Sequence, residues 1–307
     1  RIHMNKNQNT QDRKVTGLYI MDKEKYFKNK NRIVIKIGSS SLIHEETGGL
    51  DYDKLEKLVR VICDLKNQGK EVVLVSSGAI GVGVKALGLL RKPKTVSLKQ
   101  ACAAVGQGQL MMIYQKLFFE YHKTAAQVLL TFDVVSSDER RHNAINTFNE
   151  LLQLDVVPVV NENDTVGIDE LDDSVTFGDN DTLSAIVASM IHADLLIILT
   201  DIDGLYTDDP HTHADAKLIH VVEEIDDNIK SMAKGAMSSY GTGGMSTKIA
   251  AARIATNSNT DMAIVSGADL NNINRLLHGE DIGTLFLSHK EKDFNVEKFI
   301  LSKEYLE

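Results

Sequence analysis

Short runs of consecutive apolar residues recur along this chain, with longer stretches between them in which apolar positions repeat every three or four residues. The short runs are rich in Val, Ile and Leu, which is typical of strands buried on both faces and hence of a parallel sheet. Six runs predict strands, namely Ile33–Ile37, Val72–Val75, Gln127–Leu130, Val156–Val160, Leu195–Leu199 and Met262–Val265.

The stretches between these runs predict helices. In the first, Asp53 and Glu56 resemble a capping box, Gly69 resembles a stop signal, and one apolar stripe joins Leu55, Leu58, Val59, Ile62 and Leu65. The other expected helices are Leu98–Tyr121, which Gly106 and Gly108 could bend, Glu139–Leu154, Thr182–Ile191, Met245–Asn257 and Asp269–His278. Strands that alternate with helices predict an α/β fold, a three-layer αβα sandwich with a mainly parallel central sheet.

Composition narrows the class of protein further. The 307 residues are 43% hydrophobic and carry a net charge of -9, which argues against a nucleic-acid or membrane-surface protein. No run of 18 apolar residues and no signal-peptide core occur in the sequence. Cys63 and Cys102 both lie in apolar helical patterns, so we expect buried free thiols and a cytoplasmic protein.

The glycine-rich stretch Gly241–Lys248 is the most informative motif. Glycines leave backbone N–H groups accessible, and the hydroxyls and the lysine that follow lead directly into the predicted helix Met245–Asn257. Such a loop at a helix N-terminus favours an anion, and Lys248 adds a full positive charge. The alternative is a glycine-rich turn followed by an ordinary surface lysine.

Lys36 interrupts the first apolar strand. A buried lysine without a partner is costly, and Gly38 with three serines after it favours a phosphate partner. The alternative is a lysine that reaches solvent from an edge strand. Lys36 and Lys248 could flank one phosphoryl group, the positive charge that phosphoryl transfer needs. No Walker A or protein-kinase catalytic-loop pattern occurs, and Gly78–Gly83 is a poor dinucleotide fingerprint.

Small and polar residues also follow the second, fourth and fifth predicted strands, at the strand ends where ligands of such sheets bind. Together with the glycine-rich motif they form an ordered set that resembles the amino acid kinase family, and within it the branch that phosphorylates glutamate. The motifs are Lys36-x-Gly38-Ser39-Ser40, Ser76–Ile80, Asn161–Asp164, Gly178–Asp181, Thr200-Asp201 and Thr242–Lys248, and the resemblance covers about Arg32 to Leu287.

The resemblance implies ATP-dependent phosphorylation of the glutamate side-chain carboxylate, with Mg²⁺ bound mainly through the nucleotide phosphates. Lys36 and Lys248 would stabilise the transferring phosphoryl group, and Asp181 would orient them. Glutamate would bind to Ser77, Asp164 and Asn180. ATP would bind to Lys36, Thr200, Asp201, Thr242, Gly243, Gly244, Met245, Ser246, Thr247 and Lys248.

From the residues alone, several of these roles have simpler alternatives. Asp181 could be a helix N-cap, Asp164 could form an Asx-turn after its strand, and Ser77 could be a capping hydroxyl. A carboxylate nucleophile is already ionised at neutral pH, so the absence of an obvious catalytic histidine does not weaken the interpretation.

The resemblance also implies a domain plan and partners. Residues 1–30 are polar and aperiodic, and we expect a disordered extension or a leader left from cloning; residues 31–290 would form the kinase domain. Residues 291–307 would be a short tail, without the PUA-type domain that many bacterial members carry. A homo-oligomer, feedback inhibition by proline in proline biosynthesis, and a downstream reductase for the glutamyl phosphate are expected partners and controls.

Two other functions stay open on the sequence. The acceptor could be aspartate, acetylglutamate, carbamate or a nucleoside monophosphate, although an acidic Asp164 suits a substrate with a free amine. The chain could also be a non-catalytic nucleotide-binding protein on the same fold, which the presence of both lysines and Asp181 argues against.

Overall fold

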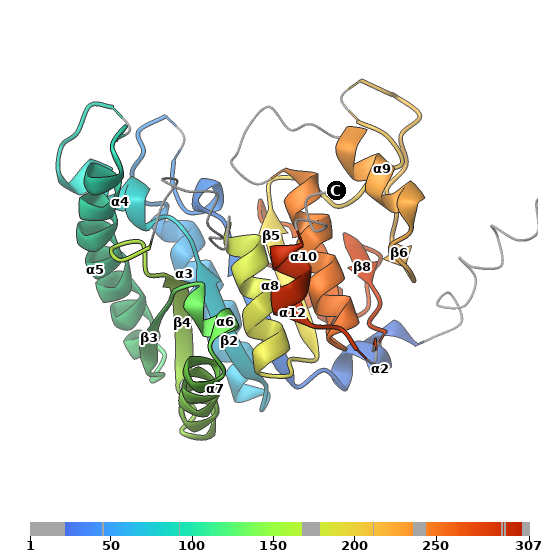
Figure 1. The fold of residues 1–307 in the computed structure, drawn as a ribbon, viewed down its shortest axis with the longest axis horizontal. Coiled ribbons are helices and arrows are strands. Elements are labelled where there is room, and N and C mark those ends of the chain that lie inside the picture. The colour runs from blue at the N-terminus through green and yellow to red at the C-terminus, as the bar shows by residue number, and fades with distance from the viewer. Residues whose placement is uncertain are drawn as a thin grey trace, which may run out of the picture.

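The parallel sheet that the apolar runs predict is present in the computed structural model (Figure 1). The structure describes residues 22–44, 46–91, 93–167, 179–210, 212–235, 244–289, 291 and 293–302. Within these residues eight strands form one sheet in the order β3, β4, β2, β1, β5, β7, β8, β6. Their bounds are β1 Arg32–Ile37, β2 Glu71–Ser76, β3 Ala125–Leu130, β4 Val157–Glu162, β5 Leu195–Thr200, β6 Val221–Val222, β7 Asp261–Ser266 and β8 Thr284–Phe286.

All six strands predicted from the apolar runs are confirmed, and they are parallel to one another. The additional strands β6 and β8 pair parallel with each other, and β8 pairs antiparallel with β7. Both are three residues long or shorter, so they leave no apolar run in the sequence. The chain leaves β1 toward β2 on one side, while β5 and β7 lie on the other, which puts a topological switch point at the middle of the sheet.

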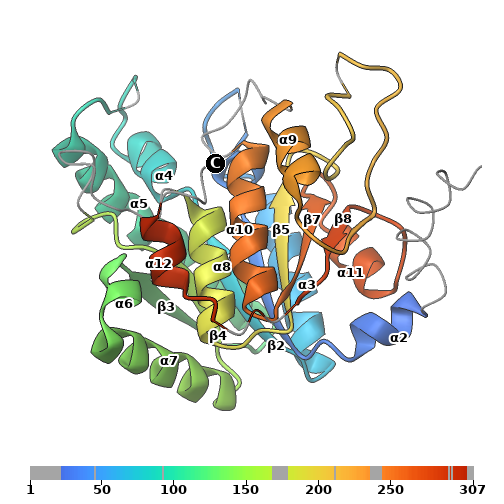
Figure 2. The ribbon, with the colours of Figure 1, turned by 45° about the vertical axis from the view of Figure 1, so that its right-hand side comes forward.

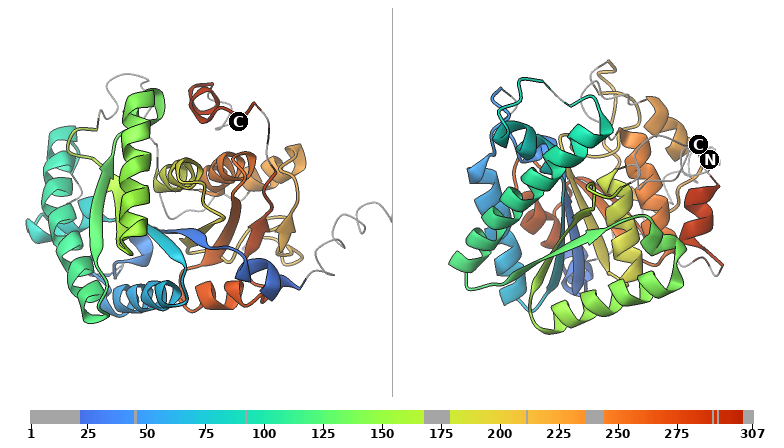
Figure 3. Two further views of the ribbon diagram at one scale, coloured as in Figure 1. Left: turned by 90° about the horizontal axis from the view of Figure 1, so that it is seen from below. Right: turned by 60° about the vertical axis from the view of Figure 1, so that its left-hand side comes forward.

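Helices cover both faces of the sheet, as the view from below shows (Figure 3), and the three-layer αβα prediction is confirmed. One core contains apolar side chains of α2, α3, α5 and α11, and the opposite core contains those of α6, α7, α8, α9, α10 and α12. The helix bounds are α2 Lys23–Lys28, α3 Tyr52–Asn67, α4 Ala79–Ala86, α5 Val96–Glu120, α6 Asp133–Ser136, α7 Asp138–Gln153, α8 Asn180–Met190, α9 Asp227–Gly235, α10 Met245–Asn257, α11 Asn272–Leu277 and α12 Val296–Leu301, with a 3₁₀ turn η1 at Ser39–Ser41.

Strand alternation decides on which face Lys36 lies. Val34 belongs to the core under α8 and α10, whereas Ile35 and Ile37 belong to the opposite core. Successive side chains of a strand point to opposite faces, so Lys36 points to the same face as Val34. That face is the one on which α8 and α10 lie side by side (Figure 2).

Two glycines explain a helix that the sequence did not predict. A Cβ at Gly83 would lie 1.8 Å from the carbonyl oxygen of Cys102, and one at Gly106 would lie 1.7 Å from that of Ala79. These glycines let α4 and α5 pack backbone against backbone. The glycine pattern Gly78–Gly83 is therefore mostly the short helix α4, and α5 is one helix from Val96 to Glu120.

The N-terminal side of the domain also differs from the prediction. Residues 23–28 form α2 and bury Phe27, so the predicted disordered extension over residues 1–30 is wrong for this helix; residues 1–21 lie outside the described part of the chain. The carboxylate of Asp51, rather than that of Asp53, caps α3 by accepting from the Lys54 N–H.

Two expectations from the composition concern the cysteines and membrane-spanning helices. Cys63 and Cys102 are free and buried, as predicted, and burial raises the pKa of Cys63 to about 11. Among the helices that the structure describes, none combines the length and the apolar character that crossing a membrane requires.

Candidate active site

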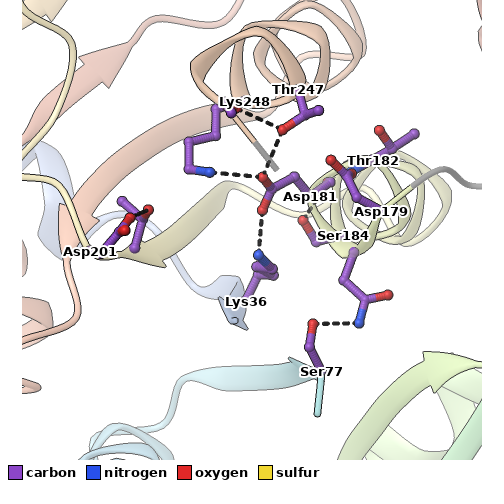
Figure 4. A network of polar contacts seen from close by, with 12 residues as sticks. Lys36, Ser77, Asp179, Asp181, Thr182, Ser184, Asp201, Thr247 and Lys248 are labelled. Carbon is purple, nitrogen blue, oxygen red and sulfur yellow. Dashed lines mark hydrogen bonds and ion pairs between the residues drawn. The ribbon is translucent and has the colours of Figure 1, made fainter. Parts of the chain in front are cut away.

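Three charged side chains from distant parts of the chain meet above the middle of the sheet (Figure 4). Lys36 comes from β1, Asp181 from the first turn of α8, and Lys248 from the first turn of α10. The Lys36 Nζ lies 2.5 Å from Asp181 Oδ1, and the Lys248 Nζ lies 3.1 Å from Asp181 Oδ2. The two ammonium groups therefore converge on the two oxygens of one carboxylate.

Burial strengthens the electrostatic interactions of these three groups. Lys36, Asp181 and Lys248 are 8%, 1% and 5% exposed. Burial alone would raise the pKa of Asp181, but the two lysines outweigh it and hold that pKa below its ordinary value. One carboxylate neutralises only one of the two ammonium charges, so the three groups together carry a net positive charge suited to an anionic phosphoryl group.

The cap of α8 is Asp179, not Asp181. Its carboxylate accepts a hydrogen bond from the Thr182 N–H at 2.8 Å, so the simpler alternative for Asp181 is wrong. Burial, followed by repulsion from the Asp181 carboxylate, raises the pKa of Asp179. Asp179 thus fixes the helix start while Asp181, two residues later, points at the lysines.

The N-terminus of α10 presents backbone donors to the same place. Its N-cap Gly244 provides no side-chain cap, and the Thr247 hydroxyl donates to the Gly244 carbonyl at 2.8 Å and to Asp181 Oδ2 at 3.2 Å. Ser246 is exposed, whereas the side chain of Met245 is buried in the core. Met245 could therefore contact a nucleotide through its backbone only.

Two of the predicted nucleotide residues lie at the end of β5. The Thr200 hydroxyl is buried and donates to Asp201 Oδ1 at 3.0 Å, while Asp201 itself is exposed. In the view of Figure 4, Asp201 lies to the left of the lysines, on the β5 side of the cluster. The predicted residues Thr242 and Gly243 fall outside the described part of the chain.

Neutral side chains lie on the β2 and β4 side of the cluster formed by Lys36, Asp181 and Lys248. The Asn180 Nδ2 donates to Ser77 Oγ at 2.6 Å and to Asn161 Oδ1 at 2.9 Å. Ser77 follows β2 directly, and Gly78 after it adopts a φ of 105°, a left-handed conformation that glycine tolerates best. Asp164 is half-buried in the turn that follows β4.

The structure thus places the described site residues at the carboxyl ends of β1, β2, β4 and β5 and at the starts of α8 and α10. Sequence reasoning missed two residues that belong to this network. Asn161 lay inside a motif, and its position at the end of a buried apolar strand was a usable signal. Gln107 of α5 could not have been found in this way, because in the sequence a single glutamine on a helix looks the same as a solvent-facing residue.

Comparison with known proteins gives the same picture. The profile of the Amino acid kinase family matches residues 31–266. A glutamate 5-kinase of Clostridium perfringens is 51% identical over 266 residues, which cover 87% of this chain and 98% of the relative. A glutamate 5-kinase of Carboxydothermus hydrogenoformans is 51% identical over 275 residues, covering 90% of this chain and 72% of the relative.

Solved structures agree on the fold. The carbamate kinase from Giardia lamblia bound to AMP-PNP superposes with a TM-score of 0.59 at 15% identity, covering 85% of this chain and all of that one. The UMP kinase from Ureaplasma parvum gives a TM-score of 0.56 at 16% identity, with 85% and 100% coverage. At these identities the likeness concerns the fold alone.

Proposed function

The chain belongs to the amino acid kinase family, and we propose that it transfers the γ-phosphoryl group of ATP to the side-chain carboxylate of L-glutamate. The product is glutamyl 5-phosphate, the first intermediate of proline biosynthesis. The observation that carries this proposal is the convergence of Lys36 and Lys248 on Asp181 beside the Ser77–Asn180 pair. We take residues 31–290 as the main part of the domain that performs the reaction, to which α2 and α12 add buried side chains from outside these bounds.

Lys36 and Lys248 provide the main catalytic effect. In the transfer, a glutamate carboxylate oxygen attacks the γ-phosphorus, and the bond from that phosphorus to the bridging oxygen of ADP breaks, with its electron pair leaving on ADP. Charge spreads over the oxygens of the moving group, where two buried ammonium groups stabilise it. Asp181 holds both ammonium groups in place.

The acceptor needs no general base, because a carboxylate nucleophile is ionised at neutral pH. Ser77 and Asn180 would hold the glutamate as hydrogen-bonding groups, and the carboxylate of Asp164 would attract its ammonium group. The neutral groups Ser77 and Asn180 avoid the like-charge repulsion that acidic residues would exert on the substrate carboxylates.

The residues present fit ATP with Mg²⁺. The uncapped N-terminus of α10 and the two lysines are donors for a triphosphate, and Thr200 and Asp201 lie beside them at the end of β5. Mg²⁺ binds polyphosphate oxygens readily, and when bound it would neutralise phosphate charge. Within the described residues no group of three or more His, Cys, Asp or Glu side chains is arranged to hold a metal ion.

Hydroxylamine trapping tests the function directly. Acyl phosphates react with hydroxylamine, so glutamate, ATP and Mg²⁺ should give a hydroxamate whose yield requires all three. Aspartate and acetylglutamate are the matched acceptors. A hydroxamate formed faster with either of them, or ATP loss that does not depend on glutamate, would contradict the proposed acceptor.

A homo-oligomer is the second part of the proposal, and the exposed face of α5 supports it. Four large apolar side chains on that helix are exposed at intervals of seven residues: Leu98, Val105, Met112 and Phe119. The stripe extends over about 32 Å at 1.5 Å per residue. A row of exposed apolar side chains is a surface suited to burial against a partner, and an uncharged stripe can face its own copy across a two-fold axis.

Light scattering after size-exclusion chromatography tests the oligomer. We expect wild-type protein to elute as an oligomer and Met112→Lys to shift to a smaller mass. Leu154→Lys is the matched control, because Leu154 is 70% exposed at the end of α7, away from the stripe. A monomeric wild type, or an unchanged mass for Met112→Lys, would overturn the α5 interface.

The remaining partners rest on the family resemblance. We propose feedback inhibition by proline, a reductase that consumes the glutamyl phosphate, and a cytoplasmic location that suits the free thiols of Cys63 and Cys102. Addition of proline to the hydroxamate assay tests the first, with inhibition expected and undiminished yield as the contrary result.

A further inference from the structure

A chain of side-chain amides leads from the proposed acceptor pocket to the edge of the sheet. Asn161, which accepts from Asn180, donates in turn through its Nδ2 to Gln107 Oε1 at 3.0 Å. The Gln107 Nε2 then donates to Gln127 Oε1 at 3.1 Å. Gln107 lies on α5 and Gln127 on the edge strand β3, so the chain joins α8, β4, α5 and β3.

The burial of each amide indicates which of these hydrogen bonds water cannot replace. Asn161 is only 4% exposed, Gln107 is half-buried and Gln127 is exposed. A buried amide that loses its partner suffers a desolvation cost, whereas water replaces the lost partner of an exposed amide. Gln107 is therefore the last amide of the chain whose contact solvent does not readily replace.

The donor-to-acceptor direction of this row of amides determines whether the Ser77 hydroxyl can donate to the substrate. Asn180 uses both N–H groups, one toward Ser77 and one toward Asn161, so Ser77 Oγ is an acceptor in this network. The hydroxyl hydrogen of Ser77 is then available to donate, which is what a carboxylate substrate requires. If the amides were reversed, Asn180 would present its oxygen to Ser77 and would take that hydrogen.

We infer that Gln107 is a positioning residue for the acceptor substrate: by accepting from Asn161, it holds the amides in the direction that leaves the Ser77 hydroxyl free to donate to the glutamate carboxylate. This inference rests on the proposed function and deepens it. Gln107 itself does not touch the reacting atoms. Its effect should therefore appear in the KM for the acceptor rather than in kcat or in the KM for ATP.

The test is Gln107→Met, which keeps an unbranched side chain of similar length and removes the amide. We expect the KM for glutamate to rise about 2- to 13-fold, the factor that corresponds to one neutral hydrogen bond, with kcat and the KM for ATP unchanged. Gln107→Ala should behave alike and serves if the methionine variant does not fold. Gln127→Met is the matched control, one amide further out, and should leave the KM for glutamate unchanged.

A double-mutant cycle separates positioning from general structural damage. If Gln107 acts through Asn161, then Gln107→Met should raise the KM for glutamate in wild type but add nothing in an Asn161→Ala background. Additive effects, or an unchanged KM in Gln107→Met, would overturn the inference.

The wild-type control distinguishes this inference from the proposed function. Hydroxamate formation with glutamate by wild type is measured first, and its absence refutes the proposed acceptor alone. The KM comparison is then made with whichever acceptor supports turnover, and it decides the role of Gln107 in the same way.

Discussion

The two halves of the candidate site use opposite chemistry. On the nucleotide side, Lys36, Asp181 and Lys248 are buried charges that pair with one another. On the acceptor side, the groups proposed to hold the substrate carboxylate, Ser77 and Asn180, are neutral and are linked by hydrogen bonds to further amides, while the charged Asp164 is proposed for the substrate ammonium group. Charge is placed where charge moves during the reaction, and neutral donors are placed where an anion must only be held.

This contrast predicts different kinetic consequences. Losing a buried charge removes stabilisation that exists mainly in the transition state, so it should lower kcat. Losing a neutral hydrogen bond to the acceptor removes binding that substrate and transition state share, so it should raise KM. The predictions below test this division, from the largest expected effect to the smallest.

Asp181→Asn should have the largest effect on stability, because it removes the carboxylate that pairs with two buried ammonium groups. We expect a loss of about 3–5 kcal/mol in the free energy of unfolding, measured by denaturant titration at neutral pH. Substrate kinetics should show a fall in kcat in the same variant. An equal stability for both proteins would mean that the lysines do not depend on Asp181.

The pH dependence of that difference follows from the lowered pKa of Asp181. The carboxylate stabilises the folded state fully above the pKa of the unfolded chain, about 3.9, and the contribution is lost as the pH falls through the lower folded pKa. The advantage of wild type over Asp181→Asn should therefore stay flat from neutral pH to about pH 5 and shrink below it. A difference that already declines between pH 7 and 5 would contradict this assignment.

Lys36→Ala and Lys248→Ala should each lower kcat by about 10²- to 10³-fold, since a donor aimed at developing charge is worth about 3 kcal/mol. The KM for glutamate should change far less. Lys66→Ala is the matched control, because Lys66 is also buried and paired with a carboxylate, that of Asp155, but lies outside the site. It should lower stability and spare kcat. If either active-site variant keeps wild-type kcat, the lysine mechanism fails.

Ser77→Ala should raise the KM for glutamate about 10- to 100-fold, the range expected for a hydrogen bond to a charged group. Because this bond would form in both the bound substrate and the transition state, kcat should fall by less than about 3-fold. Ser136→Ala, at an exposed position at the end of α6, is the control and should change neither value. A fall in kcat with an unchanged KM would erase the contrast between the two halves.

The extent to which the sequence predicted this site follows the same division. Lys36 and Lys248 were predictable because a lysine inside an apolar strand, or after a glycine-rich loop, conflicts with its surroundings and demands a partner. Asp181 was ambiguous, since Asp179 and Asp181 are equally good caps on sequence, and only the geometry assigned the cap to Asp179.

Gln107 and α4 were not predictable, because tertiary contacts decide both. The direction of an amide depends on neighbours from β4 and β3, and Gly83 of α4 is where the backbone of α5 approaches too closely for a Cβ. The strands β1 to β5 and β7 needed no such information, since their own apolar runs define them.

Tyr114→Phe should give the smallest effect and marks the boundary of the acceptor network. The Tyr114 hydroxyl lies 2.8 Å from Ser76 Oγ, both are buried, and Ser76 immediately precedes Ser77. Removing it should lower the free energy of unfolding by about 1 kcal/mol, as expected for one buried neutral hydrogen bond. The KM for glutamate should change by less than about 2-fold, because Ser77 is oriented by Asn180 and not by its neighbour in sequence. A larger rise in KM would extend the acceptor network through Ser76 to Tyr114, and would show that nearness to Ser77 rather than a hydrogen bond to the amide chain determines acceptor binding.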